Sequence, residues 1–356
     1  MNDVIVIGGG QSGLTAARTL RTHGLQPLVL EAGPEPVGAW PSYYDSLTVF
    51  SPVEHSAMPG HAFPGDPEHY PLRDEVVDYL RGYANSLDVE IRAHTRVDTV
   101  TASIDGGFLV HTTAGNELPA AGIVVASGSF TNPVRPTLPG QDTFAGQVLH
   151  VADYRNPKPY VGQRLVVVGS GNSAIQVAQE LAEVATVTVA SRQPLHFFPQ
   201  RPGGKDVHHW LSSSGFDHLP PEWLARIVGN RLVMDDGTYS HAFAAGLWDR
   251  RPMFTALDGD RVVWADGTTE AVDTVLLATG YLPSVSYLRD LGALDPVGLP
   301  LHAGGISTTH PGLVYLGLEF QRSFSSNTLR GVHRDAEYVV PPLAAHVRRA
   351  PASVGL

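Results

Sequence analysis

Two glycine-rich loops, each set between an apolar run and a helical pattern, constrain the fold of this chain more than any other feature. The first loop, 8–13, follows the apolar run 3–7, and the second, 169–174, follows the apolar run 164–168. Each loop is followed by a helical pattern and then by a further apolar run. The sequence therefore predicts two βαβ units, each with parallel strands.

Loops of this kind bind the pyrophosphate of a dinucleotide. Glycine lets the backbone turn tightly and approach the phosphates at the amino end of the helix. A glycine loop alone is weak evidence, but both loops have the expected strand and helix around them. Ala174 takes the place of the third glycine in the second loop, where a small residue is enough for the helix to pack on the strand.

Residues of opposite charge follow the two loops at the same spacing. Glu31 stands 23 residues after Gly8, and Arg192 stands 23 residues after Gly169. A carboxylate accepts hydrogen bonds from ribose hydroxyls and would repel the 2′-phosphate of NADP, whereas a guanidinium pairs with that phosphate and Ser191 can add a hydrogen bond. We therefore assign FAD to the first unit and NADPH to the second. The alternative is that Arg192 only solvates the end of a strand.

The order of the predicted elements indicates an α/β protein of two domains. The chain has 356 residues, and single cores stop growing at roughly 250–300 residues. The Pro-rich stretch 33–72 is longer than ordinary loops, so we expect it to cover something. A helix is predicted at 73–86, then a β-meander, a buried strand at 122–126 and a Pro-rich linker at 156–162.

The last part of the chain is predicted to return to the first domain. Buried strands are predicted at 275–278 and 313–316, and a hairpin turn at Asp266-Gly267, whereas 193–260 shows no clear periodicity. We predict two Rossmann-like domains of the three-layer ββα/βαβ type, with the NADPH domain inserted in the FAD domain. The expected boundaries are 1–157 (FAD, first part), 158–274 (NADPH) and 275–356 (FAD, second part).

The composition of the chain excludes several classes of partner and of functional site. The net charge of −11 comes with no basic block, which argues against nucleic acid and anionic lipid as partners. We find no secretory signal and no apolar run near the roughly 20 residues that span a bilayer, so we expect a cytoplasmic protein. With no cysteine, disulfides, thiolate metal sites and a catalytic thiol are excluded. The adjacent pair His208-His209 has no carboxylate at ligand spacing, so we predict no metal site.

On these residues the chain resembles the flavin-containing monooxygenase superfamily, from Val4 to about Arg334. The stretch 144–154 is similar to the identifying pattern FxGxxxHxxxY, and 277–281 is similar to FATGY. Residues 38–40 resemble the GxW element near the flavin, and 95–97 resemble the stretch that faces the adenine. The segments 50–52 and 323–326 resemble the compact bacterial branch often described as arsenic-resistance flavin monooxygenases, although a chain without thiolates offers arsenic no soft ligand.

One departure from the family pattern concerns the flavin ring. Where many members carry an asparagine in YxSLxTN, this chain has Phe50 and Ser51, and Ser51 is the nearest polar substitute. We take Phe50, Ser51 and Arg201 as candidate catalytic residues, although the cluster 196–201 that holds Arg201 could equally pack between the domains. The aromatic residues of the Pro-rich stretch could cap the flavin ring. For His150, within the matched pattern, a structural role is favoured over catalysis.

The resemblance implies an FAD-containing, NADPH-dependent monooxygenase. NADPH would reduce the flavin, O2 would give a C4a-peroxyflavin, and one oxygen would pass to a small amine, sulfide or carbonyl substrate. The alternative is a reductase that passes electrons to a quinone or a redox protein. The oligomeric state is not predicted. The expected cofactor-binding residues are Gly8, Gly10, Gln11, Ser12, Gly13, Glu31, Ala32, Gly38, Trp40, Val97, Ala126, Gly128, Gly169, Gly171, Asn172, Ser173, Ala174, Ser191, Arg192, Thr279, Gly280 and Gly317.

Overall fold

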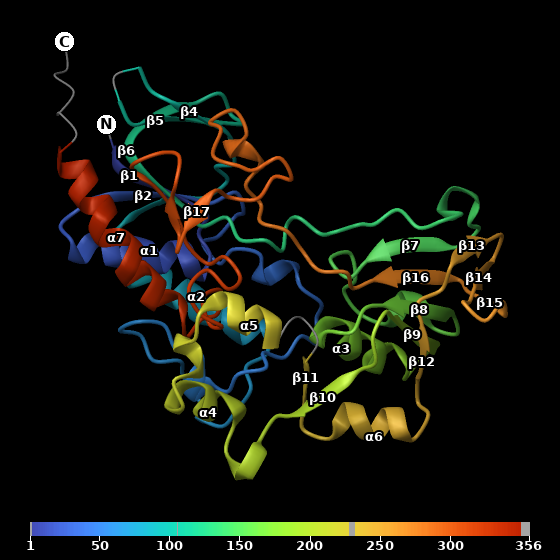
Figure 1. Cartoon of the computed structure of the whole chain (residues 1–356). Coiled ribbons are helices and arrows are strands. Elements are labelled where there is room, and N and C mark those ends of the chain that lie inside the picture. Colours follow the sequence, from blue (N-terminus) through green and yellow to red (C-terminus); the bar gives the residue numbers. More distant parts are fainter. Residues whose placement is uncertain (1, 105, 228–231, 350–356) are drawn as a thin grey trace.

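The computed structural model describes residues 2–104, 106–227 and 232–349, and it forms two lobes of the same design (Figure 1). In each lobe a parallel sheet lies between helices on one face and a small antiparallel sheet on the other. The predicted α/β class with two Rossmann-like domains, one inserted in the other, is confirmed.

The first lobe is built on a sheet in the order β17-β18-β19-β6-β1-β2-β3. Helices α1 and α7 cover one face, α2 packs beside α1, and the meander of β4, β5 and the start of β6 covers the other face. The elements are β1 (Asn2–Ile7), α1 (Gln11–Thr22), β2 (Pro27–Leu30), α2 (Arg73–Asn85), β3 (Glu90–Arg92), β4 (Val97–Ala102), β5 (Phe108–Thr112), β6 (Glu117–Val125), β17 (His302–Ala303), β18 (Ile306–Ser307), β19 (Leu313–Tyr315) and α7 (Val332–Arg349).

Strand β1 shows why this sheet is apolar on both faces. Val4 and Val6 pack against α1 and α7, while Ile5 and Ile7 pack against the meander. All four side chains are at most 4% exposed. Burying a side chain of this size stabilises the fold by about 1.5–3 kcal/mol, so both faces of the strand select apolar residues. A central strand of this kind gives a continuous apolar run rather than an alternating one.

The second lobe repeats the arrangement around a parallel sheet in the order β12-β9-β8-β16-β7. Helix α3 covers one face together with α6, and the antiparallel strands β13, β14 and β15 cover the other. The elements are β7 (Gln147–His150), β8 (Arg164–Val168), α3 (Asn172–Leu181), β9 (Thr186–Ser191), α6 (Thr238–Ala244), β12 (Asp249–Pro252), β13 (Ala256–Asp258), β14 (Arg261–Val263), β15 (Thr269–Ala271) and β16 (Thr274–Leu277). The predicted hairpin at Asp266-Gly267 is the turn between β14 and β15.

Two expectations about the division of the chain are wrong. The buried strand predicted at 275–278 is β16, and it pairs with β8 and β7 in the second lobe rather than returning to the first sheet. The Pro-rich segment 156–162 is not a linker between domains, because it joins β7 to β8 within one sheet. The expected boundaries at 157/158 and 274/275 therefore do not match the division of strands between the two sheets. The apolar pattern identified these strands, but it carries no information about which strands pair.

The two chain segments that cross between the lobes run side by side (Figure 1). Segment 126–134 pairs with segment 279–284 through the backbone bonds Val134 N to Gly280 O (2.9 Å), Leu282 N to Asn132 O (3.0 Å) and Ser284 N to Gly128 O (2.8 Å). The hydroxyl of Thr279 also donates to the carbonyl of Val134 (2.6 Å). The lobes are thus joined by a short two-stranded bridge.

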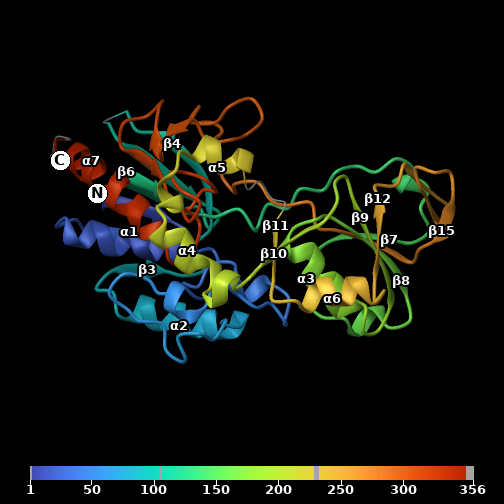
Figure 2. The same ribbon diagram turned by 60° about the horizontal axis from the view of Figure 1, so that its bottom comes forward.

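The segment without clear periodicity leaves the second lobe and returns to it. It contains the strands β10 (His196–Pro199) and β11 (Leu232–Asp235), which pair in parallel, and the short helices α4 (Val207–Ser213) and α5 (Pro221–Ile227). Figure 2 shows α4 and α5 lying against the first lobe. There the buried Asp217 forms ion pairs with Arg330 and Arg334. This excursion, residues 200–227, therefore bridges the lobes a second time.

In the described part of the chain, no helix has both the length and the apolar character needed to cross a membrane.

Candidate functional site

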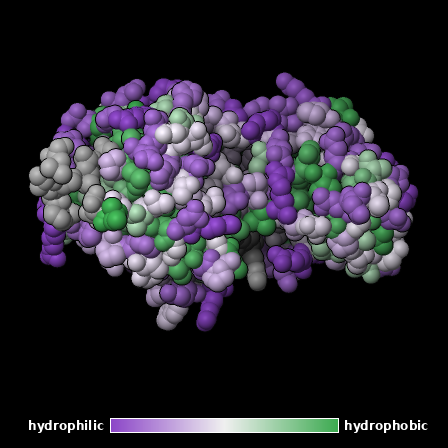
Figure 3. All heavy atoms as spheres, turned by 90° about the horizontal axis from the view of Figure 1, so that it is seen from above, coloured by the Kyte–Doolittle hydropathy of each residue, from purple (hydrophilic) through white to green (hydrophobic). Residues whose placement is uncertain are grey.

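One large cavity lies where the two lobes meet, and it touches both glycine loops. Its volume is about 810 Å³, and Figure 3 shows a recess between the lobes. The carboxyl ends of β1, β2 and β6 and the amino end of α3 open into it, which is where α/β proteins bind ligands. We call this the interlobe cavity. Of the predicted site residues it is lined by Gly8, Gly10, Gln11, Ser12, Glu31, Ala32, Gly38, Trp40, Phe50, Ser51, Val97, Ala126, Gly128, Asn172, Ser173 and Gly317.

The remaining predicted residues lie around the cavity without lining it. Gly13, Gly169 and Ala174 pack the two loops against their own lobes, Gly171 precedes α3, and Thr279 and Gly280 belong to the bridge between the lobes. Ser191 ends β9, Arg192 follows it, and Arg201 lies on the excursion.

The first glycine loop is packed so closely that Gly8 and Gly13 have no room for a side chain. Gly8 has a φ of +109°, and a Cβ atom there would lie 2.4 Å from the carbonyl oxygen of Ala126. A Cβ atom on Gly13 would lie 1.8 Å from the carbonyl oxygen of Gly8. No side chain caps the amino end of α1, so its first amides can bind an anion. The carboxylate of Glu31 meanwhile accepts hydrogen bonds from the amides of Gly9 (2.7 Å) and Gly33 (2.6 Å).

The second glycine loop repeats this geometry. A Cβ atom on Gly169 would lie 2.6 Å from the carbonyl oxygen of Ala278 in the chain after β16. It would also lie 3.1 Å from the Cβ of Ala174, so the helix packs on the loop through two small residues. Helix α3 likewise has no side-chain cap. Asn172 at its start accepts a hydrogen bond from the amide of Met234 (2.9 Å), which ties the loop to β11.

Two guanidinium groups flank Ser191 at the carboxyl end of β9. Arg192 is exposed and has no carboxylate partner among the residues the structure describes. Arg250, on the neighbouring strand β12, donates from Nε to the hydroxyl of Ser191 (2.9 Å) and from a terminal nitrogen to its carbonyl oxygen (2.9 Å). No sequence pattern indicates Arg250, because it follows Arg192 by 58 residues and only the pairing of β12 with β9 brings them together.

Aromatic side chains form a continuous wall of the cavity. Trp40 packs edge-on against Tyr43 (ring centroids 5.5 Å apart), Tyr43 against Phe130 (5.0 Å) and Phe130 against Tyr281 (4.9 Å). The indole of Trp40 also donates to the side chain of Gln11 on the first loop (2.9 Å). The Pro-rich stretch thus covers the cavity, as we expected from its length. Burial raises the pKa of Tyr43 well above its usual value, so its hydroxyl stays protonated.

The three candidate catalytic residues are not brought together. Phe50 and Ser51 line the cavity, and the hydroxyl of the buried Ser51 is 2.9 Å from that of Ser56. Arg201 does not line the cavity, and its guanidinium forms an ion pair with Glu68 (2.9 Å). Among the described residues, two arginines line the cavity: Arg96, within the stretch that resembles the adenine-facing element, and Arg330, which the sequence did not single out.

A buried histidine completes this part of the cavity wall. His208 is 2% exposed, and its ring stacks on that of Phe50 with centroids 5.7 Å apart. Its Nδ1 atom lies 2.7 Å from a carboxylate oxygen of Asp206. The sequence analysis considered His208 only together with His209, as a possible pair of metal ligands. Its real partner is the aspartate two residues earlier, and only the local turn at the start of α4 shows that contact.

The stretch that resembles FxGxxxHxxxY mainly shapes the second lobe, although its Val151 lines the cavity. A Cβ atom on Gly146 would lie 2.5 Å from the carbonyl oxygen of Asp273, so glycine allows β7 and the start of β16 to pack closely. His150 is fully buried, accepts a hydrogen bond from the amide of Ala152 (3.0 Å) and packs edge-on against Tyr281. The hydroxyl of Tyr154 donates to Glu180 (2.6 Å). These contacts support the structural reading of His150.

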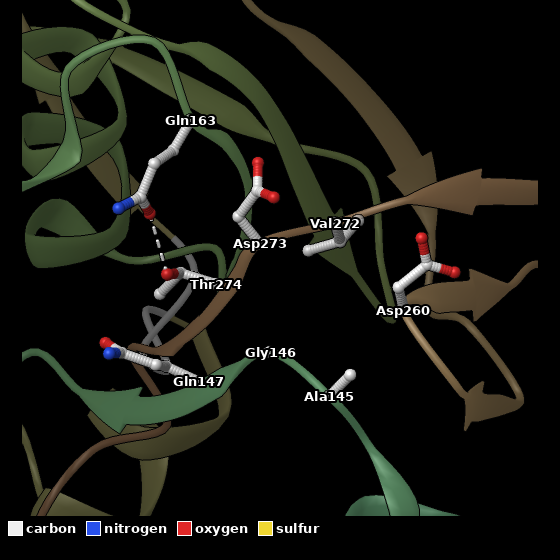
Figure 4. A pocket seen from close by; sticks show the side chains of 8 residues that line it. All are labelled: Ala145, Gly146, Gln147, Gln163, Asp260, Val272, Asp273 and Thr274. Carbon is white, nitrogen blue, oxygen red and sulfur yellow. Dashed lines mark hydrogen bonds between the residues drawn. The ribbon is translucent and has the colours of Figure 1, made fainter.

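A second, smaller cavity of about 220 Å³ lies in the second lobe, at the amino ends of β7, β8 and β16 (Figure 4). It holds the hydrogen bond from Thr274 to Gln163 (2.9 Å), and the carboxylate of Asp273 is engaged by Arg164. Nucleotides bind at the carboxyl ends of such strands, so this cavity does not belong to the nucleotide site.

Comparisons with known proteins agree with this geometry. Residues 5–214 match the model of a family described as pyridine nucleotide-disulphide oxidoreductase. The chain is 32% identical to an uncharacterized CzcO-like oxidoreductase of Geobacillus kaustophilus, over 97% of this chain and 99% of the relative. It is 29% identical to the indole-3-pyruvate monooxygenase YUCCA1 of Oryza sativa, over 82% and 79%. The solved flavin-containing monooxygenase of Stenotrophomonas maltophilia superposes with a TM-score of 0.86 at 30% identity, over 97% and 99% of the two chains.

Proposed function

The chain belongs to the pyridine nucleotide-disulphide oxidoreductase family, and we propose that it is a monooxygenase that oxidises a small amine, sulfide or carbonyl compound with NADPH and O2. It is an oxidoreductase that uses FAD and NADPH. Its similarity to proteins named as monooxygenases supports the oxygen-transfer step.

The observation that carries the proposal is that one cavity reaches the amino ends of both nucleotide-binding helices. Gly10 to Ser12 at the start of α1, and Asn172 and Ser173 at the start of α3, line the same interlobe cavity. A hydride donor and its acceptor must meet at contact distance with their reacting faces aligned. Two separate nucleotide pockets could not satisfy that requirement, whereas a shared cavity can.

The residues of the first loop fit FAD. The close packing of Gly8 and Gly13 leaves only backbone at the point where a pyrophosphate would meet the amides of α1. Glu31, at the end of β2, would accept hydrogen bonds from the ribose, and Gly38 and Trp40 would hold the ring side of the site. When bound, FAD supplies the redox chemistry by taking a hydride from NADPH and reacting with O2.

The residues around Ser191 fit the 2′-phosphate of NADPH. Arg192 and Arg250 offer two guanidinium groups that no carboxylate neutralises in the described part of the chain. Guanidinium groups bind phosphate through paired hydrogen bonds. The buried hydroxyl of Ser191 donates to the carbonyl oxygen of Gln193 (2.7 Å) and accepts from Arg250, so it positions that guanidinium.

The side chains of this protein would contribute to oxygen transfer by excluding water from the reacting groups and by holding the two lobes in place. The aromatic wall from Trp40 to Tyr281 would exclude water from the reacting groups. The buried Tyr44 lies beside this wall, and its hydroxyl donates a hydrogen bond to the side chain of Gln176 on α3. This contact holds α3 against the Pro-rich stretch.

The test separates oxygen transfer from electron transfer alone. Purified enzyme loaded with FAD is reduced by NADPH without oxygen, and then mixed with ¹⁸O2 and either benzylamine or benzyl methyl sulfide. We expect ¹⁸O in the organic product and less hydrogen peroxide than NADPH consumed. Recovery of all reducing equivalents as peroxide, together with faster turnover when a quinone is added, would instead establish the reductase.

A further inference from the structure

The contacts of Asp206 fix the protonation pattern of His208 in the cavity wall. The buried carboxylate accepts hydrogen bonds from the hydroxyl of Tyr70 (2.5 Å), the amide of Gln200 (2.9 Å) and both the backbone N–H (2.8 Å) and Nδ1 (2.7 Å) of His208. Although burial acts to raise the pKa of Asp206, these bonds hold it well below its usual value. An ionised carboxylate can only accept hydrogen bonds, so Nδ1 of His208 carries the proton.

The other ring nitrogen of His208 is therefore an acceptor. In a neutral imidazole with its proton on Nδ1, Nε2 has a free lone pair. Nε2 has no hydrogen-bond partner in the described part of the chain, although His208 lines the interlobe cavity. Burial is the largest influence on the pKa of His208, which lies below its usual value although Asp206 acts to raise it. The ring thus stays neutral at ordinary pH.

The groups around His208 reinforce this state. The ring of His55 lies 6.0 Å away; its own buried Nε2 atom has no hydrogen-bond partner among the described residues, and a carboxylate oxygen of Glu54 lies 3.6 Å from it. Arg330 repels a proton on His208, while its two terminal nitrogens are engaged by the buried Asp217. Phe50 covers one face of the imidazole. This corner of the cavity therefore presents an acceptor, and its arginine is occupied elsewhere.

We infer that His208 is an acid–base residue of the interlobe cavity whose Nε2 atom accepts an N–H group of the substrate, with Asp206 as its positioning residue, so that the substrate is a primary or secondary amine. The inference rests on the proposed monooxygenase function. Of the three substrate classes named there, sulfides and carbonyl compounds bring no hydrogen-bond donor to an acceptor. An amine does, and a site built around an acceptor discriminates strongly in favour of a donor.

N-oxygenation of an amine releases a proton, which the imidazole of His208 can accept. The lone pair of the neutral amine forms the new N–O bond while the O–O bond of the oxygen donor derived from O2 and NADPH breaks, which leaves a hydroxylammonium ion. The electron pair of the broken bond stays on the outgoing oxygen, which finally takes up the proton. The N–H bond of that ion then breaks, its electron pair stays on nitrogen, and the proton passes to Nε2. The added oxygen withdraws electron density, so the hydroxylammonium is a much stronger acid than the parent ammonium and can protonate an imidazole. The imidazolium formed is stabilised by the carboxylate of Asp206.

Three benzyl compounds test the inference because they differ only in the donor. Benzylamine carries N–H groups, whereas N,N-dimethylbenzylamine and benzyl methyl sulfide carry none when neutral. His208→Phe keeps a ring beside Phe50 and removes the acceptor. We expect kcat/KM for benzylamine to fall about 100-fold, the lower end of the range for an acid–base group, and kcat/KM for the other two to change less than about 3-fold. His209→Phe is the matched control, because His209 does not line the cavity. An equal loss on all three compounds would assign His208 a packing role and overturn the inference.

A spectroscopic measurement tests the protonation state of His208 in enzyme that is not catalysing the reaction. In the FAD-loaded enzyme, ¹⁵N NMR of labelled histidine should show Nε2 of His208 unprotonated at neutral pH, with its signal shifted by benzylamine and unmoved by the sulfide. Asp206→Asn should move the proton to Nε2 and lower kcat for benzylamine more than it raises KM. A protonated Nε2 in the wild type, or no response to benzylamine, overturns the inference. If the wild type oxygenates none of the three compounds, the proposed function fails, and this arm still decides the role of His208.

Discussion

Arg250 makes two hydrogen bonds to Ser191, one to the side-chain hydroxyl and one to the carbonyl oxygen, each 2.9 Å long. The pair holds a guanidinium beside the strand end from which Arg192 projects. Because β12 runs parallel to β9, the two arginines reach the same edge of the sheet from different strands. The proposed phosphate site is therefore assembled by tertiary structure and not by the loop motif alone.

Removing either arginine should weaken NADPH more than NADH. A hydrogen bond to a charged group contributes about 1.5–3 kcal/mol, so Arg192→Ala and Arg250→Ala should each raise KM for NADPH about 10-fold or more. KM for NADH, which lacks the 2′-phosphate, should change little. Steady-state kinetics with both nucleotides measure this.

Arg251→Ala is the control for these variants. Arg251 is the next residue on β12, but its guanidinium pairs with Asp266 (2.8 Å) and lies over the ring of Trp264. Its loss should leave the ratio of the two KM values unchanged. If Arg192→Ala and Arg250→Ala raise both KM values equally, neither residue reads the phosphate.

The sequence was sufficient for the local elements because local physics determines them. The apolar runs at β1, β8 and β16 are buried on both faces, and the glycine loops stand where backbone passes close to backbone. It was not sufficient for sheet membership. β16 was assigned to the wrong lobe because strand pairing depends on tertiary contacts, which leave no mark in the period of apolar residues.

The glycine loops of the candidate site could be predicted from the sequence, whereas most side chains that surround the cavity could not. Glycine spacing between a strand and a helix indicates a phosphate loop from sequence alone. Arg250, Asp206 and Arg330, in contrast, come from the segment without clear periodicity and from the chain after β19. Arg201 was favoured by its position near the aromatic cluster, but a partner from the Pro-rich stretch, Glu68, holds it outside the cavity.

Gly13→Ala should prevent the first loop from closing. The new Cβ would lie 1.8 Å from the carbonyl oxygen of Gly8, a distance that requires the backbone to move. We expect loss of FAD from the purified protein, measured as the ratio of flavin to protein absorbance, together with a lower Tm.

Gly82→Ala is the matched control for this prediction. Gly82 lies within α2, and its Cβ would meet only the ring of His61 at 3.7 Å. Alanine is favoured over glycine inside a helix by about 0.5–1 kcal/mol, so this variant should keep its FAD and have an equal or higher Tm. Equal flavin content in the two variants would contradict the packing argument for Gly13.

Asp217 should hold the excursion against the first lobe. Its side chain is completely buried and pairs with both terminal nitrogens of Arg330, with Arg334 3.6 Å away. Breaking a buried ion pair costs about 3–5 kcal/mol, because it leaves an uncompensated charge. Asp217→Asn should therefore lower Tm and expose the excursion to limited proteolysis. The double variant Asp217→Asn with Arg330→Met should recover part of the loss, and a double variant less stable than the single one would contradict this account.

Stability should fall as the pH drops below neutrality. Burial lowers the pKa of five histidines below the ordinary value, namely His55, His150, His208, His302 and His333. The unfolded chain titrates these groups near pH 6.5, so between that pH and the lower folded values it binds more protons than the folded chain. Stability gained from keeping them neutral is thus complete above pH 6.5 and is lost as the pH falls through the folded pKa values.

Thermal unfolding of FAD-loaded protein between pH 8 and pH 5 measures this dependence, and Tm should decline mainly below pH 6.5. His150→Asn should reduce the decline. His150 is fully buried, and an asparagine oxygen can replace Nδ1 as the acceptor for the amide of Ala152, so the variant removes a titrating group while keeping the contact. Asp335 acts in the opposite direction, because burial raises the pKa of its carboxyl and its contribution is lost as the pH rises. A Tm that is constant or rises on acidification from pH 7 to pH 5 would show that the neutral histidines do not control stability in this range.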